Sequence, residues 1–156
     1  MEPKIKTIEP IEVLYVRKTG PYVKSAQEAW SAIAEYIKKK GISGEKIRSL
    51  GISHGDPQTD DANKLLYDAC IFFEGDMQPE GEVKKQTIEG GLYAIFTHKG
   101  PYDGLQKIYG EIFQEWLPAS GKKIKNTPMF EDYVVYRMTE KDPSKWITDI
   151  YVPIEE

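Results

Sequence analysis

The chain contains two copies of one pattern, and this duplication limits the folds available to it. The tripeptide Gly20-Pro21-Tyr22 recurs 80 residues later as Gly100-Pro101-Tyr102. Gly41 and Gly121 keep the same offset, so the segments between tripeptide and glycine are equal in length. Because a chance tripeptide would not keep a second landmark in register, we interpret the chain as an internal repeat.

The end of each copy carries a further match. Asp68 lies within the strand-like segment 67–73, and Asp149, 81 residues later, lies within the similar segment 148–154. We therefore predict a single domain over residues 1–156 made of two repeats, about 4–74 and 83–154, with a linker at 75–82.

Each repeat has the same predicted order of elements. After each Gly-Pro-Tyr, apolar residues recur at helical intervals, which predicts an amphipathic helix that ends at Gly41 or Gly121. Proline at the start suits the first turn of a helix, where a backbone N–H has no partner. Runs rich in Ile, Val, Tyr and Phe predict strands at 4–18 (interrupted at Pro10), 48–55, 66–74, 83–99 (broken near 90–91), 129–137 and 146–154.

The order strand, helix, strand, strand in both halves predicts an α+β fold. We expect duplicated βαββ units with antiparallel sheet, one helix packed on each, and a central groove on the pseudo-twofold axis. Junctions between similar halves are frequent sites of small-molecule pockets.

Composition excludes several classes of protein. The net charge of −4 disfavours direct nucleic-acid binding. No apolar run approaches the roughly 18 residues of a membrane span, and the first residues lack the apolar segment of a signal peptide. Cys70 is the single cysteine, so an intramolecular disulfide is impossible. We expect a cytoplasmic protein with no membrane association.

Common catalytic and cofactor motifs are missing from the sequence. It has no glycine-rich phosphate loop, no paired cysteines and no zinc-binding His-Glu-x-x-His. His54 and His98 lie in different halves without metal-ligand spacing, so we expect surface or hydrogen-bonded histidines, no metal and no cofactor, haem included. Cys70, between apolar neighbours, is expected in the core.

Glu131 is the most informative polar residue. Strand alternation over 128–136 places it on one face with Met129, Tyr133 and Val135. Burial among such neighbours raises the pKa of a carboxyl group and lets it attract a hydrophobic cation, with aromatic rings adding cation–π contacts. A raised pKa also suits a general acid or base. The alternative is that Glu131 points to solvent or pairs with a lysine.

Aromatic residues supply candidate walls for a pocket. Trp30 lies beside the apolar stripe of the first helix, and two more lie within that of the second. In each repeat, one further aromatic residue begins the last strand. The candidates are Trp30, Tyr109 and Trp116 on helices, and Tyr67, Tyr133 and Trp146 on strands. Core packing alone would also explain the three on helices, whereas Tyr67 and Trp146 are expected near the centre of the groove.

The order of these motifs resembles the GyrI-like small-molecule-binding domain, which is also the effector-binding part of some AraC- and MerR-type regulators. The shared features are strand-Gly-Pro-Tyr-helix twice, Trp116-Leu117-Pro118, and Pro128-x-Phe130-Glu131-x-Tyr133. The resemblance implies a duplicated fold with an aromatic groove in which a glutamate meets hydrophobic cations. By motif position that glutamate is Glu131.

The resemblance leaves three functions open. Only three residues precede Lys4, so we expect a stand-alone member that captures hydrophobic, cationic compounds. Some stand-alone relatives hydrolyse strained cyclopropane-bearing compounds with a glutamate in the same groove, which would make Glu131 the catalytic residue. The gyrase-inhibitory subgroup suggests DNA gyrase as an alternative partner.

Overall fold

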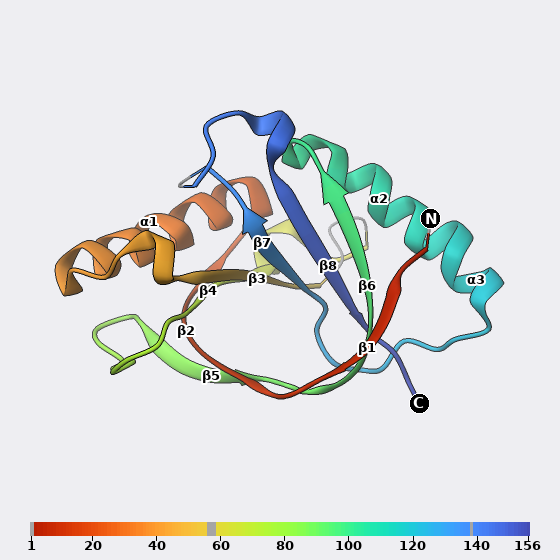
Figure 1. Cartoon of the computed structure of the whole chain (residues 1–156), viewed down its shortest axis with the longest axis horizontal. Helices are drawn as coiled ribbons and strands as arrows, with labels where there is room; N and C mark the ends of the chain where they lie inside the picture. The colour runs from red at the N-terminus through yellow and green to blue at the C-terminus, as the bar shows by residue number, and fades with distance from the viewer. Residues whose placement is uncertain (1, 56–58, 138) are drawn as a thin grey trace. The chain divides into compact units, whose positions relative to one another are not determined.

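The computed structural model describes residues 2–55, 59–137 and 139–156. The chain divides into two compact units, unit 1 (Met1–Glu9 and Gly90–Glu156) and unit 2 (Pro10–Glu89). Each unit has four antiparallel strands and a long helical segment, with short 3-10 turns besides (Figure 1). The predicted α+β class and the duplicated βαββ order are therefore confirmed.

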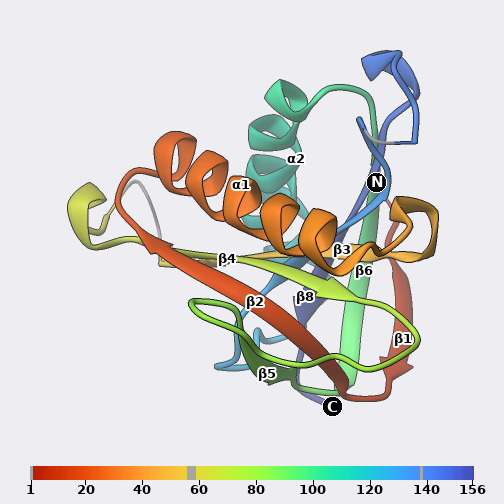
Figure 2. The same cartoon turned by 90° about the vertical axis from the view of Figure 1, so that its left-hand side faces the viewer.

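Unit 2 has the strand order β3-β4-β2-β5. Its elements are β2 (Ile11–Thr19), α1 (Tyr22–Lys40), β3 (Arg48–His54), β4 (Leu66–Phe72) and β5 (Lys84–Ile88). Helix α1 begins after Pro21 and ends at Gly41, whose φ of 68° is a left-handed conformation that glycine adopts readily. Figure 2 shows α1 lying across β2 and β4, where Ala29 and Ile33 are buried in the core of this unit.

Unit 1 has the strand order β1-β6-β8-β7. Its strands are β1 (Lys4–Ile8), β6 (Gly91–Lys99), β7 (Phe130–Val135) and β8 (Ile147–Pro153). Its helical segment consists of α2 (Leu105–Glu111), a π-helical turn (Ile112–Trp116) and α3 (Leu117–Ser120). Leu105 and Ile112 pack on Ala94, Phe96 and Ile150 of the sheet.

The first strand of each repeat pairs with the second strand of the other repeat. β1 pairs with β6, from Lys4 opposite Ile95 to Ile8 opposite Gly91. β5 pairs with β2, from Ile11 opposite Ile88 to Tyr15 opposite Lys84. The predicted interruptions at Pro10 and near 90–91 are confirmed, and at both the chain passes from one unit to the other.

The second helix is interrupted, contrary to the single helix that the periodicity predicts up to Gly121. The N–H of Leu117 donates to the carbonyl of Ile112, five residues earlier, which is a π-helical hydrogen bond. Pro118 explains the interruption, because it has no N–H and its ring would clash with the carbonyl of Gln114 in a regular α-helix. α1, which has no internal proline, runs unbroken for 19 residues.

A buried polar cluster joins the strands of unit 2 around Asp68, which is fully buried on β4. The Asp68 carboxylate accepts hydrogen bonds from Arg17 Nε at 2.7 Å and Gln86 Nε2 at 3.0 Å, and His54 Nε2 lies 2.9 Å from it. Burial would raise the pKa of Asp68, but these partners outweigh it and lower the pKa to about 2. His54 was predicted to lie at the surface or to form hydrogen bonds, and it does form one with Asp68.

Neighbouring Cys70 on β4 is buried, as predicted, and burial raises the pKa of its thiol well above the ordinary value. Within the described ranges, no group of three or more His, Cys, Asp or Glu side chains could hold a metal ion. No helix built from those residues is long and apolar enough to cross a membrane.

Candidate functional site

Glu131 lies on the face of the unit 1 sheet that packs against α2. It is opposite Ile150 in the β7–β8 register, and Ile150 is fully buried in the core beneath α2. Tyr133 follows two residues later on the same face, as strand alternation predicts. A register irregularity between Tyr133 and Val135 interrupts the pairing, which resumes with Val135 opposite Ile147. Such bulges are common beside active sites.

Two tyrosines hold the Glu131 carboxylate. Tyr133 donates its hydroxyl hydrogen to Oε1 at 2.8 Å, and Tyr109 on α2 donates to Oε2. Burial raises the pKa of Glu131 above its ordinary value, while both hydrogen bonds favour the charged form and oppose that rise. In the described part of the chain its hydrogen-bond partners are thus phenols rather than lysines.

The helical segment supplies further rings near Tyr109. Phe113, in the π-helical turn, stacks parallel to Tyr109 with ring centroids 6.4 Å apart. Trp116 instead packs edge-on against Phe96 at 5.0 Å, within the core of unit 1. Tyr109 therefore contacts the carboxylate directly, whereas Trp116 contacts Phe96 of β6. Phe113 was not predicted as a site residue, although it lies on the same apolar stripe.

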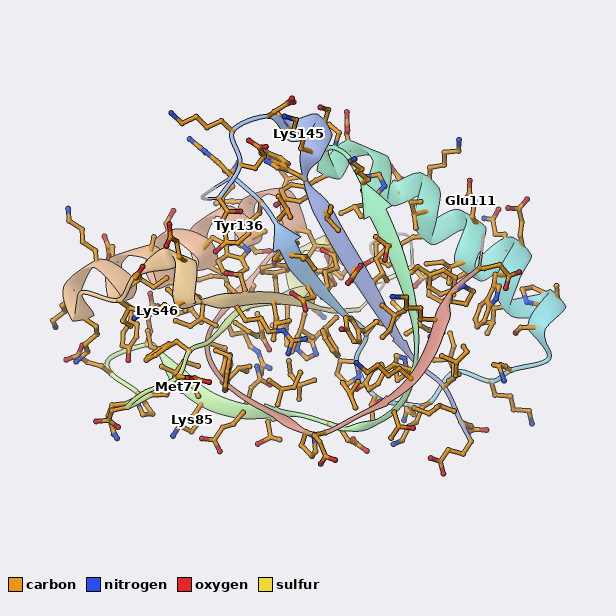
Figure 3. The ribbon with its side chains drawn as sticks, viewed as in Figure 1. Lys46, Met77, Lys85, Glu111, Tyr136 and Lys145 are labelled. Carbon is orange, nitrogen blue, oxygen red and sulfur yellow. The ribbon has the colours of Figure 1, made fainter. Side chains whose placement is uncertain are left out.

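Tyr102 covers the outer side of this aromatic group. Its ring lies 5.7 Å from that of Tyr133 and 5.0 Å from that of Trp146, and the residue is 40% exposed. Burial of its hydroxyl and the negative charge of Glu131 raise the pKa of Tyr102 to about 12. Tyr136, labelled in Figure 3, adds to that rise.

Sequence reasoning used Tyr102 only as a landmark of the repeat. Its position at the entrance to a helix on the Glu131 side of the sheet is the signal that could have identified it. Trp146, which was predicted, donates its Nε1 hydrogen to the Glu140 carbonyl at 2.8 Å. This bond fixes the indole against Tyr102.

Trp30 and Tyr67, the other two predicted residues, belong to unit 2. Trp30 Nε1 donates to the Tyr67 hydroxyl at 2.8 Å, and the Tyr22 ring packs edge-on against Tyr67 at 6.3 Å. Within unit 1 the structure thus brings Glu131, Tyr109 and Tyr133 together with Tyr102 and Trp146. Within unit 2 it brings Trp30 together with Tyr67 and Tyr22.

Comparison with known sequences identifies a family. A family model described as the GyrI-like small molecule binding domain matches residues 1–155. The chain is 28% identical over 131 residues to the probable transcriptional regulator YgiV of Escherichia coli K12, covering 79% of both chains. It is 26% identical to a DNA gyrase inhibitor of Erwinia billingiae, covering 88% of this chain and 86% of that protein.

Solved structures share the fold. The C-terminal domain of EcmrR is matched with a TM-score of 0.81 at 22% identity, covering 99% of this chain and 98% of the domain. The chain spans 57% of the EcmrR chain solved in complex with DNA. SAV2435 bound to tetraphenylphosphonium gives a TM-score of 0.64 at 18% identity, with coverage of 99% and 94%. A hydrolase from Listeria innocua gives 0.65 at 18% identity, with coverage of 99% and 92%.

Proposed function

The chain belongs to the GyrI-like small-molecule-binding domain family, and we propose that it captures hydrophobic, cationic compounds at the site around Glu131. The observation that carries this proposal is the Glu131 carboxylate, half-buried among aromatic rings and held by the hydroxyls of Tyr109 and Tyr133. No cationic side chain neutralises it within the described residues, so a ligand could supply the missing charge.

The physical chemistry favours a cation with apolar substituents. A carboxylate removed from water is costly unless an opposite charge compensates it. A lipophilic cation loses little hydration on entering an aromatic site, and each ring face in contact adds about 0.5–2 kcal/mol. The phenol donors favour the charged form of Glu131 without blocking all of its lone pairs, since each oxygen accepts one hydrogen bond.

The comparisons support this choice of ligand. SAV2435, a structural neighbour along 99% of this chain, was solved with tetraphenylphosphonium, which is a hydrophobic cation. For Trp30 and Tyr67 in unit 2, the role as ligand contacts rests on the sequence and the family resemblance. The role of Trp116 as a ligand contact rests on the same grounds.

Titration calorimetry with tetraphenylphosphonium tests the proposal. The wild type is expected to bind, and Glu131→Gln to lose at least tenfold in affinity while keeping its melting temperature within a few degrees. Glu115→Gln is the matched control, because Glu115 lies exposed in the same helical segment and should bind as the wild type does. Absence of binding to the wild type, or equal binding by Glu131→Gln, would overturn the proposal.

A hydrolytic function is the second candidate. The raised pKa of Glu131 and its contact with two phenols suit a general base that activates water, and a structural neighbour from Listeria innocua is described as a hydrolase. Incubation with an electrophilic cyclopropane should then yield the water adduct by mass spectrometry, and Glu131→Gln should yield none. Binding without product would exclude this reaction for the compound tested.

Interaction with DNA gyrase is a third candidate function. Its support is that two relatives of the chain are described as DNA gyrase inhibitors. A supercoiling assay with purified gyrase decides it. Inhibition by the folded protein is the expected result, and undisturbed supercoiling at a large molar excess would contradict it.

A further inference from the structure

Among the residues that the structure describes, a buried hydroxyl without a hydrogen-bond partner lies near Glu131. Thr148, on β8, is fully buried, and its Oγ1 makes no hydrogen bond within the part of the chain that the structure describes. Leaving a buried hydroxyl unpaired destabilises the folded protein, because the group loses its hydrogen bonds to water and gains none. Buried polar side chains are nearly always paired, so such a group calls for a partner.

The strand register places Thr148 in the Glu131 site. Thr148 is directly opposite Tyr133, and Glu131 is opposite Ile150, the next residue on the same face of β8. Thr148 and Glu131 are therefore diagonal neighbours, a relation that separates α-carbons by roughly 7–8 Å. One ligand of drug size can span that distance.

The hydroxyl at the matching position in unit 2 has a hydrogen-bond partner. Gly20 donates to the carbonyl of Leu65 just as Gly100 donates to that of Trp146, so Tyr67 and Thr148 are equivalent, each two residues further on. The Tyr67 hydroxyl accepts the Trp30 indole hydrogen at 2.8 Å. At the equivalent position, unit 1 thus keeps a hydroxyl but leaves it without a hydrogen-bond partner among the described residues.

The rings around Thr148 show how a ligand would reach it. Tyr133 lies opposite on β7 and Trp146 two residues before on the same chain, and the ring of Tyr102 contacts both. Tyr102 is 40% exposed. It lies in a short 3-10 turn rather than in a strand or long helix, so its ring can be displaced without disturbing the sheet.

We propose that Thr148 is a second, polar contact for the ligand of the Glu131 site, and that the site prefers hydrophobic cations carrying an oxygen function. The cationic centre lies at Glu131, the ligand oxygen accepts the Thr148 hydroxyl hydrogen, and an apolar part of the ligand replaces the ring of Tyr102. This inference rests on the proposed function, which it extends from charge and apolarity to hydrogen bonding.

The test compares two cations that differ by one oxygen: tetraphenylphosphonium and its analogue with one para-hydroxyl group. The wild type is expected to bind the hydroxylated cation about 2- to 10-fold more tightly, as one additional hydrogen bond allows. Thr148→Val keeps the side-chain shape and removes the hydroxyl. It should abolish the preference and leave the affinity for tetraphenylphosphonium within about twofold.

Ser25→Ala is the matched control. Ser25 is also buried with an unpartnered hydroxyl in the described structure, but it lies on α1 of unit 2. It should keep the preference of the wild type. Circular dichroism and melting temperature verify that each variant folds, and Thr148→Val should be at least as stable as the wild type.

The outcomes separate the two proposals. Binding of tetraphenylphosphonium with no preference for the hydroxylated analogue, or a preference that survives in Thr148→Val, overturns the role of Thr148 and leaves the proposed function standing. Failure of the wild type to bind either cation overturns both.

Discussion

Glu131 and Gly51 occupy the same register position in the sheets of their two units. Glu131 pairs with Ile150, and Gly51 pairs with Ala69, the equivalent residue of the other repeat. The repeat also matches Tyr109, which donates to Glu131, with Ala29. Duplication has therefore kept the backbone pattern, while only one copy carries the carboxylate and its phenol donor.

This asymmetry predicts the stoichiometry of binding. Titration calorimetry with tetraphenylphosphonium should give one site per chain, because unit 2 has no side chain equivalent to Glu131. Saturation at two cations per chain, both lost in Glu131→Gln, would contradict this expectation.

The affinity for a permanent cation should depend on pH. Binding requires the Glu131 carboxylate, whose pKa is raised by burial, so affinity should increase with pH through that pKa and then level off. Tyr133→Phe removes a hydrogen bond that lowers the pKa and should move the midpoint upward. Titrations from about pH 4 to pH 8 measure it. Glu131→Gln should show no such dependence, and a midpoint lowered in Tyr133→Phe would refute the account.

The Asp68 cluster should make the fold sensitive to acid. The pKa of Asp68 is about 2 when folded, against about 3.9 for an unfolded chain. Its stabilisation is therefore fully present above about pH 4 and is lost as the pH falls toward 2. Urea unfolding across this range should show that Asp68→Asn removes most of this pH dependence. A pH dependence identical to that of the wild type would argue against the cluster as its source.

Removal of the cation at this cluster should be costly. Arg17→Leu leaves the buried carboxylate with only His54 and Gln86 and is expected to cost about 2–3 kcal/mol. The cost is below that of a fully buried pair because the Arg17 side chain is 40% exposed. Lys18→Gln, which breaks the exposed pair with Glu82, is the control and should cost less than about 1 kcal/mol. Equal costs for the two variants would contradict the expectation.

Two glycines near the Tyr109 helix should respond oppositely to alanine. A β-carbon at Gly104 would lie 2.7 Å from Cε1 of His98, so Gly104→Ala should destabilise the protein by about 1–3 kcal/mol. A β-carbon at Gly110, inside α2, would meet nothing within 4 Å, so Gly110→Ala should stabilise it by up to about 1 kcal/mol. Chemical denaturation measures both. Similar shifts in the same direction would show that His98 adjusts without cost.

The sequence predicted those features that follow from local patterns. Alternation over 128–136 placed Glu131 and Tyr133 on one face, and Pro10 marked the break between β1 and β2. The π-helical turn was not predicted, because the apolar stripe favours a continuous helix up to Leu117 and only Pro118 indicates an interruption. The pairing of β1 with β6 has no local signal, because strand partners are set by the packing of the whole sheet. Thr148 was missed because an unpaired hydroxyl is defined by its surroundings rather than by its neighbours in the chain.

The pairing of β1 with β6 and of β5 with β2 bears on how such a chain could arise. A gene encoding one repeat alone would make a polypeptide whose first strand lacked its pairing partner, because that partner belongs to the other repeat. Two such polypeptides would complete each other by trading those strands, as in a swapped homodimer. Fusion of two such genes would place both exchanged strands in one chain. The two repeats could then diverge in sequence, so that one acquired Glu131 and the other did not.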